Sequence, residues 1–218
     1  MSPDRGDAAL FALAPGEIRA DLRLVASMID AGSRVLDVGC GDGELLFDLV
    51  HNKGVDGRGM ELSQSGVNAC VRHGLSVIQG DADHDLEAYP SGAFDYVVLS
   101  QTLPATRNPR RVVANLVRIG RRAIVSFPNF GHWRVRLDLL FRGRMPMSHL
   151  LSTPWYETPN IHLCTIRDFL VLCAEDGIAI ERSITLDGQG RPFTLDPAGA
   201  MANLLAAQGL FLLARPAA

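Results

Sequence analysis

Lysine is almost absent from this chain of 218 residues, because 20 of its 21 basic side chains are arginine and only Lys53 is lysine. The charge is also uneven. Residues 107–144 hold ten arginines and one acid, Asp138, so this stretch has a charge of +9, while the rest of the chain carries −12 and the net charge is −3. Arginine pairs carboxylates bidentately and stacks on aromatic rings, which suits a protein contact surface.

Long apolar runs and closely spaced cysteine pairs are also missing, and we expect no secretory leader. The nearest approach to a membrane span, around 204–214, is interrupted by Gln208 and Gly209. The four cysteines form no C-x-x-C pair. Acidic Asp4 and Asp7 stand where a signal peptide has basic residues. We therefore expect a cytoplasmic protein with reduced thiols, and neither a membrane nor nucleic acid as a partner.

Short apolar segments alternate with helical segments along most of the chain. This pattern predicts an α/β fold, a doubly wound, mainly parallel sheet of seven strands with helices on both faces. The expected strands cover residues 34–38, 57–61, 76–79, 94–100, 123–127, 179–184 and 210–214. The expected helices cover residues 18–29, 44–51, 63–73, 109–119 and 166–175, and residues 197–208 form either a further helix or a long turn.

The whole chain, residues 1–218, is expected to form one domain, since its length suits a single core. An N-terminal helix at 17–32 precedes a ligand-binding half at 33–127. A helical or loop insertion at 128–165 follows the fifth strand, and a C-terminal half covers 166–218.

A glycine-rich loop follows the first expected strand and has the sequence Asp37-Val38-Gly39-Cys40-Gly41-Asp42-Gly43. Its G-x-G-x-G spacing differs from the G-x-G-x-x-G of dinucleotide-binding loops. Asp37 and Asp42 would repel a pyrophosphate but suit a ligand with cationic groups. Glu61 ends the second strand, where an acid can accept hydrogen bonds from ribose hydroxyls. The pattern favours a nucleoside ligand, although such loops also occur for packing alone.

The loop resembles the first motif of class I S-adenosylmethionine (SAM)-dependent methyltransferases. The resemblance implies a Rossmann-like domain that binds SAM or S-adenosylhomocysteine, with or without turnover, and it places Asp81 opposite the adenine amine. The residues expected to contact this ligand are Asp37, Gly39, Cys40, Gly41, Gly43, Glu61, Leu62, Asp81, Ala82 and Gln101. For Gln101, capping of the next turn is an equal alternative.

No catalytic or metal-binding residue stands out. The segment SQTLP at 100–104 lacks the Asn/Asp-Pro-Pro-aromatic signature of methyltransferases that act on amide or amine nitrogen. Tyr156 and Glu157 could serve as an acid or base, but they lie in a proline-stiffened segment that we expect first to be a lid. Three histidines and a cysteine are residue types that bind metals, but their spacing matches no common metal site: His132, His149, His162 and Cys164.

A helix beginning at Trp133 would place four apolar side chains on one face: Trp133, Leu137, Leu140 and Phe141. This stripe either packs on the sheet or docks on a partner. Arg134, Asp138 and Arg142 would lie on another face at i, i+4 spacing, which allows ion pairs.

Four segments together resemble the MetW family of methionine biosynthesis: SQTL at 100–103, GRRAIVSFPNFGHWRVR at 120–136, RGRMP at 142–146 and TPNIHLCTIRD at 158–168. The resemblance covers residues 33–185, and Pro104 departs from the expected polar residue. It implies a protein that associates with homoserine O-acyltransferase (MetX) and supports or regulates acyl transfer to homoserine, rather than an independent catalyst. The alternative is a SAM-dependent methyltransferase that acts on a small molecule.

If the family role applies, we expect the acyltransferase to contact residues 128–168. The residues expected at that contact include Trp133, Arg134, Arg136, Arg142 and Arg144.

Overall fold

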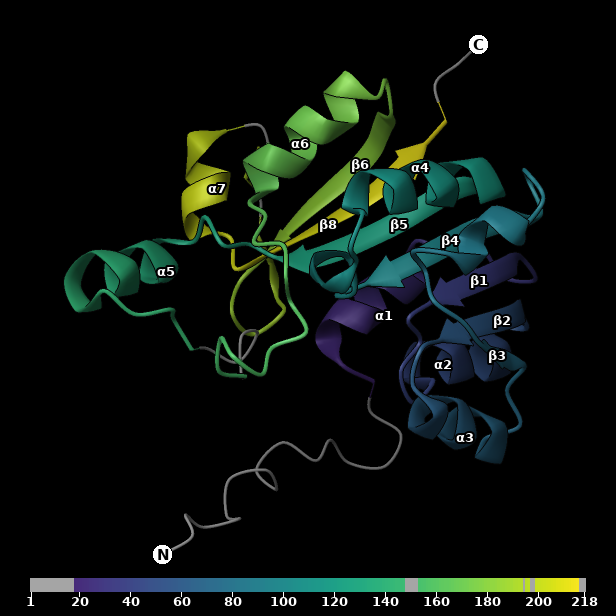
Figure 1. Cartoon of the computed structure of the whole chain (residues 1–218). Helices are drawn as coiled ribbons and strands as arrows, with labels where there is room; N and C mark the ends of the chain where they lie inside the picture. Colours follow the sequence, from purple (N-terminus) through teal and green to yellow (C-terminus); the bar gives the residue numbers. More distant parts are fainter. Residues whose placement is uncertain (1–17, 148–152, 194, 197–198, 216–218) are drawn as a thin grey trace, which may run out of the picture.

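A computed structural model describes residues 18–147, 153–193, 195–196 and 199–215. They form one eight-stranded sheet in the order β3-β2-β1-β4-β5-β8-β6-β7 (Figure 1). The strands are β1 (Arg34–Val38), β2 (Asp56–Glu61), β3 (Val77–Gln79), β4 (Phe94–Ser100), β5 (Gly120–Pro128), β6 (Ala179–Leu186), β7 (Pro192–Phe193) and β8 (Gln208–Ala214). The first five strands pair in parallel, whereas β8 runs antiparallel between β5 and β6.

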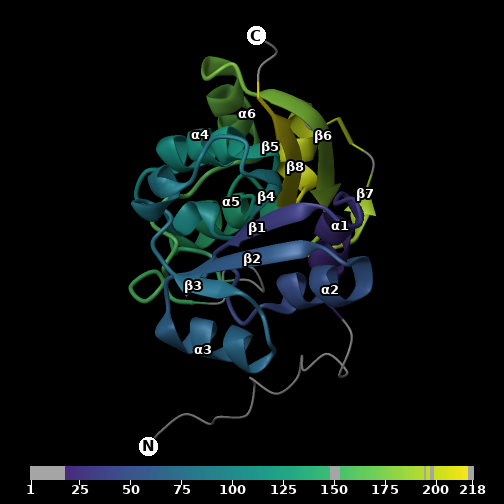
Figure 2. The same ribbon diagram turned by 90° about the vertical axis from the view of Figure 1, so that its right-hand side faces the viewer.

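Helices cover both faces of the sheet (Figure 2). One face carries α1 (Ala20–Ser27), α2 (Glu44–Lys53) and α3 (Gln64–Arg72), and the other carries α4 (Pro109–Ile119) and α6 (Ile166–Glu175). The remaining helices are α5 (Trp133–Leu137), the π-helical turn η3 (Asp138–Arg142), α7 (Ala200–Leu205) and the 3₁₀ turns η1 (Asp85–Ala88) and η2 (Leu103–Ala105). Within the described residues, no helix has the length and apolar character needed to span a bilayer.

The doubly wound α/β fold is confirmed, but the expected count of seven strands is wrong by one. The additional strand, β7, pairs with β6 through only two residues, Pro192 and Phe193. The Asp187 carboxylate accepts hydrogen bonds from the backbone N–H groups of Gln189 and Arg191 and so closes the hairpin. Two residues that begin with proline make no apolar run, so periodicity does not reveal this edge strand.

The structure also tests three segments whose form was expected from the sequence. Residues 197–208 contain a helix, α7. The N-terminal helix is shorter than the expected 17–32, and residue 17 lies outside the described residues. Of the insertion at 128–165, residues 148–152 also lie outside them.

Three phenylalanines join the C-terminal half to the central strands. Phe127 of β5, Phe169 of α6 and Phe211 of β8 are all buried. Their ring centroids lie 4.9 Å apart for Phe127 and Phe169, 5.7 Å for Phe127 and Phe211, and 4.9 Å for Phe169 and Phe211. Such aromatic clusters contribute both apolar burial and favourable ring geometry. This cluster therefore holds α6 against the sheet.

We predict that Phe169→Ala lowers the free energy of unfolding by about 3–5 kcal/mol, because it leaves a cavity between Phe127 and Phe211. Urea denaturation measures the change. Val171→Ala on the same helix is the control, since Val171 is 50% exposed and its truncation should cost less than about 1 kcal/mol. Equal losses for the two variants would contradict this account of the core.

Candidate functional site

The glycine loop turns sharply after β1 and leaves one position open. Gly39 and Gly41 have φ angles of +70° and +59°, which side chains other than glycine rarely adopt. A Cβ atom at Gly39 would lie 2.6 Å from the Thr102 hydroxyl oxygen, so this glycine lets two loops touch. At Gly41, by contrast, nothing lies within 4 Å of a Cβ atom. Gly41 is therefore the point at which a ligand can approach the backbone.

Glu61 connects this loop to the start of α3. Its Oε2 accepts a hydrogen bond of 2.9 Å from the Gly41 N–H, and its Oε1 accepts one of 2.9 Å from the Ser63 N–H. A Cβ atom on Gly66 would lie 2.7 Å from both the Glu61 Cγ and the Gly41 carbonyl oxygen. Sequence reasoning missed Gly66, although a glycine inside a helical pattern often has a packing reason.

Asp37 is buried in the middle of the sheet, opposite Gly59 of β2 and Val98 of β4. Burial, and secondarily the negative charge of Glu61, raise the pKa of Asp37 to about 7. Both causes disfavour the carboxylate, so a cation bound beside it would favour ionisation. The acid therefore changes charge near neutral pH.

The residues that follow β2 and β3 lie close to one another. The Gly80 N–H donates a 3.0 Å hydrogen bond to the Glu61 carbonyl, which brings the loop containing Asp81 beside β2. Asp81 itself accepts a hydrogen bond of 2.9 Å from the Asp83 N–H. Leu62 is 64% exposed next to Glu61, whereas Ala82 packs against the core.

Gln101, directly after β4, has a φ angle of 59° and is the one non-glycine residue with positive φ in the described part of the chain. Its backbone N–H donates to the Ser126 carbonyl at 2.9 Å, and its Nε2 donates to the Gln208 Oε1 at 3.2 Å. Ser126 and Gln208 are buried polar residues that sequence reasoning did not select. The side-chain contacts hold Gln101 in a strained conformation of the kind found at functional sites.

The structure thus brings most of the expected ligand residues to one edge of the sheet, at the carboxyl ends of β1 to β4. Cys40 differs, because its side chain packs in a small core with Leu46, Cys70 and Leu75. Its Sγ lies 3.9 Å from the Cys70 Sγ, and burial raises the pKa of both thiols. The Cys40 side chain is therefore part of this small core.

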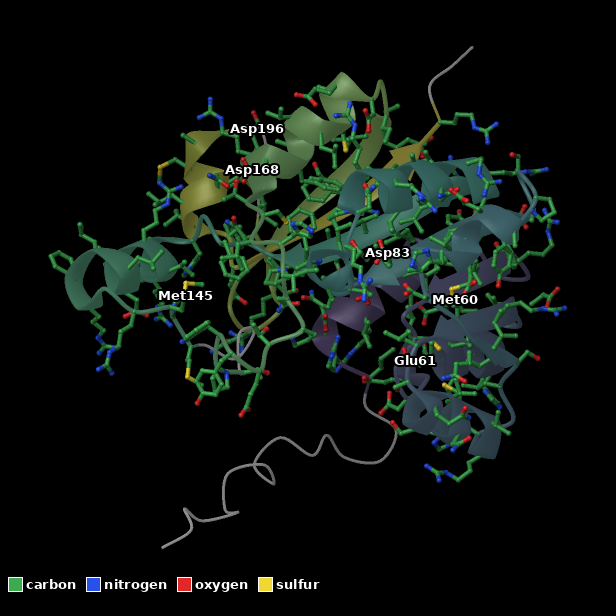
Figure 3. The ribbon with its side chains drawn as sticks, in the orientation of Figure 1. Met60, Glu61, Asp83, Met145, Asp168 and Asp196 are labelled. Atoms are coloured by element: carbon green, nitrogen blue, oxygen red, sulfur yellow. The ribbon has the colours of Figure 1, made fainter. Side chains whose placement is uncertain are left out.

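The insertion after β5 forms a second feature, separate from the glycine loop. In Figure 3, Glu61 and Met145 lie on opposite sides of the view. The apolar stripe on α5 and η3 does not pack on the sheet, since Leu140 is 74% and Phe141 77% exposed. That alternative is therefore wrong.

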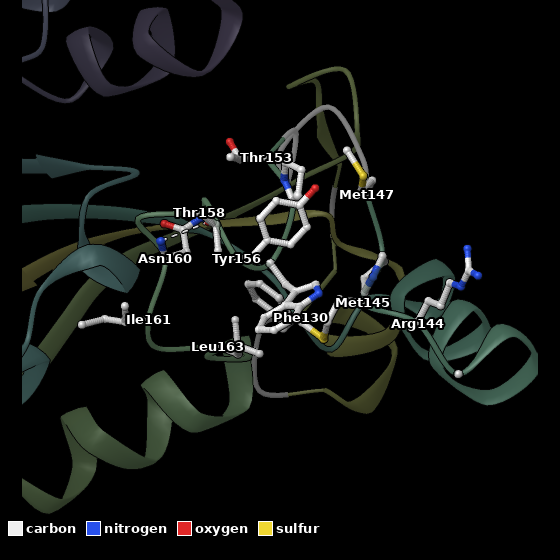
Figure 4. Close-up of a pocket in the computed structure, with 14 residues that line it drawn as sticks. Phe130, Arg144, Met145, Met147, Thr153, Tyr156, Thr158, Asn160, Ile161 and Leu163 are labelled. Atoms are coloured by element: carbon white, nitrogen blue, oxygen red, sulfur yellow. Dashed lines mark hydrogen bonds between the residues drawn. The ribbon is translucent and has the colours of Figure 1, made fainter. Parts of the chain in front are cut away.

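Together, α5 and η3 form a helical arm at residues 133–142. A cavity of about 880 Å³ lies beside this helical arm (Figure 4). Aromatic, methionine and branched apolar side chains dominate its lining, with one arginine at its edge: Phe130, Met145, Met147, Trp155, Tyr156, Ile161, Leu163 and Arg144. We call this the insertion cavity.

The arginines of the helical arm, and Arg144 just after it, have different surroundings. The guanidinium of Arg134 lies 5.3 Å from the centre of the Trp133 ring. Arg142 pairs with Asp138 at 3.4 Å, as the spacing predicts. Arg136 donates from Nε to the Gly131 carbonyl at 2.6 Å, so it helps to hold the arm. Within the described part of the chain, Arg144 has no hydrogen bond or ion pair.

Comparison with known proteins identifies the family. The model of the family described as methionine biosynthesis protein MetW matches residues 19–213. The chain belongs to the MetW family. A relative from Rhodopirellula baltica, named bifunctional methionine biosynthesis protein MetXA/MetW, is 33% identical over 78% of the chain, and the match spans 29% of that longer protein. Ubiquinone biosynthesis O-methyltransferase from Xanthomonas oryzae is 34% identical over 55% of the chain and 52% of the relative.

Solved structures confirm the class I methyltransferase fold for this MetW family member. An S-adenosylmethionine-dependent methyltransferase from Mesorhizobium loti superposes with a TM-score of 0.65 at 18% identity. The alignment covers 92% of this chain and 99% of that one. At this level of identity, the similarity establishes the fold alone.

One segment of the MetW-like insertion lies against the loop after β4. We call residues 158–163 the strap. The backbone N–H groups of Ile161 and His162 both donate to the Pro104 carbonyl, each at 2.9 Å. The His162 Nε2 donates to the Arg107 carbonyl at 3.2 Å. The backbone carbonyls of Pro104 and Arg107 thus hold the strap against the loop after β4.

The histidines and cysteine considered as metal ligands have other contacts. His132 accepts a hydrogen bond from the Arg134 N–H, and His162 is bonded to Arg107. Burial raises the pKa of the Cys164 thiol to about 12. His149 lies outside the described residues. Among the residues that the structure does describe, no three His, Cys, Asp or Glu side chains form a metal-binding group.

We predict that the raised pKa of Asp37 makes the ligand-free protein less stable as pH rises. Between about pH 4 and pH 7, the folded state retains a proton that the unfolded state has released. Relative to Asp37→Asn, the wild-type free energy of unfolding should therefore fall by about 1 kcal/mol per pH unit in this window and level off above about pH 7.

Urea denaturation at several pH values between 4.5 and 8.5 provides the measurement. Asp42→Asn, in the same loop but exposed, is the control, and its profile should follow that of the wild type. A constant difference between wild type and Asp37→Asn across this range would show that Asp37 does not titrate there.

Proposed function

We propose that this protein binds homoserine O-acyltransferase in the cytoplasm and supports or regulates its acyl transfer to homoserine. The observation that carries the proposal is the Rhodopirellula relative, whose name joins MetXA and MetW in one chain. Fusion holds two modules at a high effective concentration, which benefits modules that work in contact. We infer that the same contact forms here between separate chains.

The insertion has the properties of a protein contact surface. Interfaces are enriched in aromatic residues, methionine and arginine, and their strongest contacts are often Trp, Tyr and Arg. The helical arm and the insertion cavity expose Trp133, Met147, Trp155 and Tyr156, with Arg144 at the cavity edge. We propose that the acyltransferase inserts an apolar side chain into the cavity and places carboxylates beside the arginines.

The glycine-loop site supports SAM or S-adenosylhomocysteine as its ligand. The open backbone at Gly41 admits a nucleoside, and the acids Asp37 and Glu61 suit the positive charge of SAM. We propose that the ligand contacts the strand-end residues Asp37, Gly39, Gly41, Gly43, Glu61, Leu62, Asp81, Ala82 and Gln101, and the backbone of Cys40. Occupancy of this site would report the supply of SAM to the acyltransferase.

The alternative is methyl transfer to a small molecule, which the similarity to a ubiquinone biosynthesis O-methyltransferase supports. Methyl transfer needs mainly alignment, so the absence of an assigned acid or base does not exclude it. We favour the accessory role because the strap covers the loop after β4, where such enzymes usually hold the acceptor. Formation of S-adenosylhomocysteine from SAM with a cell extract as acceptor source would support the alternative.

We predict that Gly41→Val abolishes SAM binding, because its side chain fills the open approach to the loop. Isothermal titration calorimetry with SAM measures the affinity. Gly54→Val is a matched control, since Gly54 also has positive φ, +61°, and nothing within 4 Å of a Cβ atom, but it caps the far end of α2. Both variants suffer the same backbone strain, so equal affinities would place the ligand elsewhere.

We predict that Arg134→Glu combined with Arg144→Glu weakens the complex with homoserine O-acyltransferase at least tenfold, because both exposed cations meet carboxylates of the partner. SAM affinity should not change. Biolayer interferometry measures the complex, and an acyl transfer assay with and without this protein measures its effect.

The control replaces Arg58 and Arg72 by glutamate, which makes the same charge change on β2 and α3. Its affinity for the acyltransferase should equal that of the wild type. If the wild-type proteins form no complex and acyl transfer is unaffected, the proposed function is wrong.

A further inference from the structure

We propose that the strap, residues 158–163, couples the glycine-loop site to the insertion cavity, so that SAM occupancy changes the affinity for the acyltransferase. This inference rests on the proposed function and adds the route by which one site affects the other. Three successive contacts carry it, and each joins segments distant in sequence.

The first contact lies between the glycine loop and the loop after β4. A Cβ atom on Gly39 would be 2.6 Å from the Thr102 Oγ1 and 2.8 Å from its Cγ2, so the Gly39 backbone packs directly on the Thr102 side chain. The Thr102 hydroxyl donates to the Ser100 carbonyl at 3.0 Å, which fixes the side chain. Any ligand that moves or immobilises Gly39 therefore acts on Thr102.

The second contact joins the same loop to the strap. Thr102 precedes η2, in which Leu103 and Pro104 are buried, so a displacement of Thr102 must be shared by this turn. The Pro104 carbonyl accepts the hydrogen bonds from Ile161 and His162. The bond from the His162 ring to Arg107 holds the strap at a further point of the same segment.

The third contact lies between the strap and the insertion cavity, which strap residues line. Thr158, Asn160, Ile161 and Leu163 all belong to the cavity lining. Just beyond the strap, the Cys164 carbonyl accepts a 3.1 Å hydrogen bond from the N–H of Phe130, another lining residue. The position of the strap therefore determines the shape of the surface that the partner meets.

Thermodynamic linkage gives the proposal a strict consequence. If SAM changes the affinity for the acyltransferase by some factor, the acyltransferase must change the affinity for SAM by the same factor. Coupling between sites typically amounts to 5-fold to 150-fold, so we expect at least a fivefold change. Variants along the strap should therefore change the coupling factor without contacting either ligand.

The experiment measures both affinities with purified proteins. Biolayer interferometry gives the affinity for the acyltransferase without SAM and with saturating SAM. Calorimetry gives the SAM affinity without and with saturating acyltransferase. We expect both affinities to change at least fivefold and by equal factors.

Two pairs of variants test the route through the strap. Thr102→Ala and Thr102→Val both lose the hydroxyl, but only valine keeps two γ atoms against Gly39. Alanine should therefore reduce the coupling factor to below twofold, while valine retains most of it. His162→Ala, which loses the bond to Arg107, should lower the factor, whereas His162→Gln keeps a donor and should preserve it. Thermal unfolding followed by circular dichroism confirms that each variant folds.

The outcomes separate this inference from the proposed function. If the wild type forms no complex with the acyltransferase and leaves acyl transfer unaffected, the proposed function itself is overturned, and the coupling with it. If it binds the acyltransferase but not SAM, the proposed ligand and the coupling are overturned. If it binds both, but neither ligand alters the affinity for the other, only the coupling is overturned. Coupling that persists unchanged in both Thr102→Ala and His162→Ala would show that the strap does not carry it.

Discussion

The close approach of Gly39 to Thr102 is the constraint on which the rest of the site depends. Two loops that follow β1 and β4 can meet only because Gly39 has no side chain. That approach positions the glycine loop, whose Gly41 N–H is then bound by Glu61. On its other side it positions η2, whose Pro104 carbonyl holds the strap. The glycine loop and the insertion thus both contact the loop after β4, the first through Thr102 and the second through Pro104.

Sequence reasoning predicted the elements whose signal is local. Strands β1, β4 and β8 are short apolar runs, and their cores are buried as periodicity predicts. The glycine loop was found because its residues are contiguous, and Glu61 because it ends a strand. The Asp138–Arg142 pair follows from i, i+4 spacing within one helical segment. In each case the residues that define the feature are close in sequence.

What sequence reasoning missed depends on contacts between distant segments. Gly66 is required only because Glu61 and Gly41 lie against it, and Ser126 and Gln208 matter only because Gln101 reaches both. The fate of the apolar stripe was undecided, since a stripe has the same spacing whether it packs on the sheet or faces solvent. The strap is held largely by backbone hydrogen bonds, which leave no trace in the choice of side chains.

The arginine-rich stretch, residues 107–144, has two parts, and the arginines of each part have different surroundings. On α4 and β5, four arginines pair with acids of the body: Arg110 with Asp176, Arg111 with Glu87, Arg121 with Asp95 and Arg122 with Glu181. Arg118 of α4 instead donates to the backbone carbonyls of Leu86 and Tyr89. These paired acids neutralise part of the positive charge on this side of the stretch. On the insertion, the Arg134 guanidinium lies near the Trp133 ring, and Arg144 lines the cavity with no acid paired to it among the described residues. The acidic partner surface that we propose would therefore be attracted to the insertion rather than to the whole stretch.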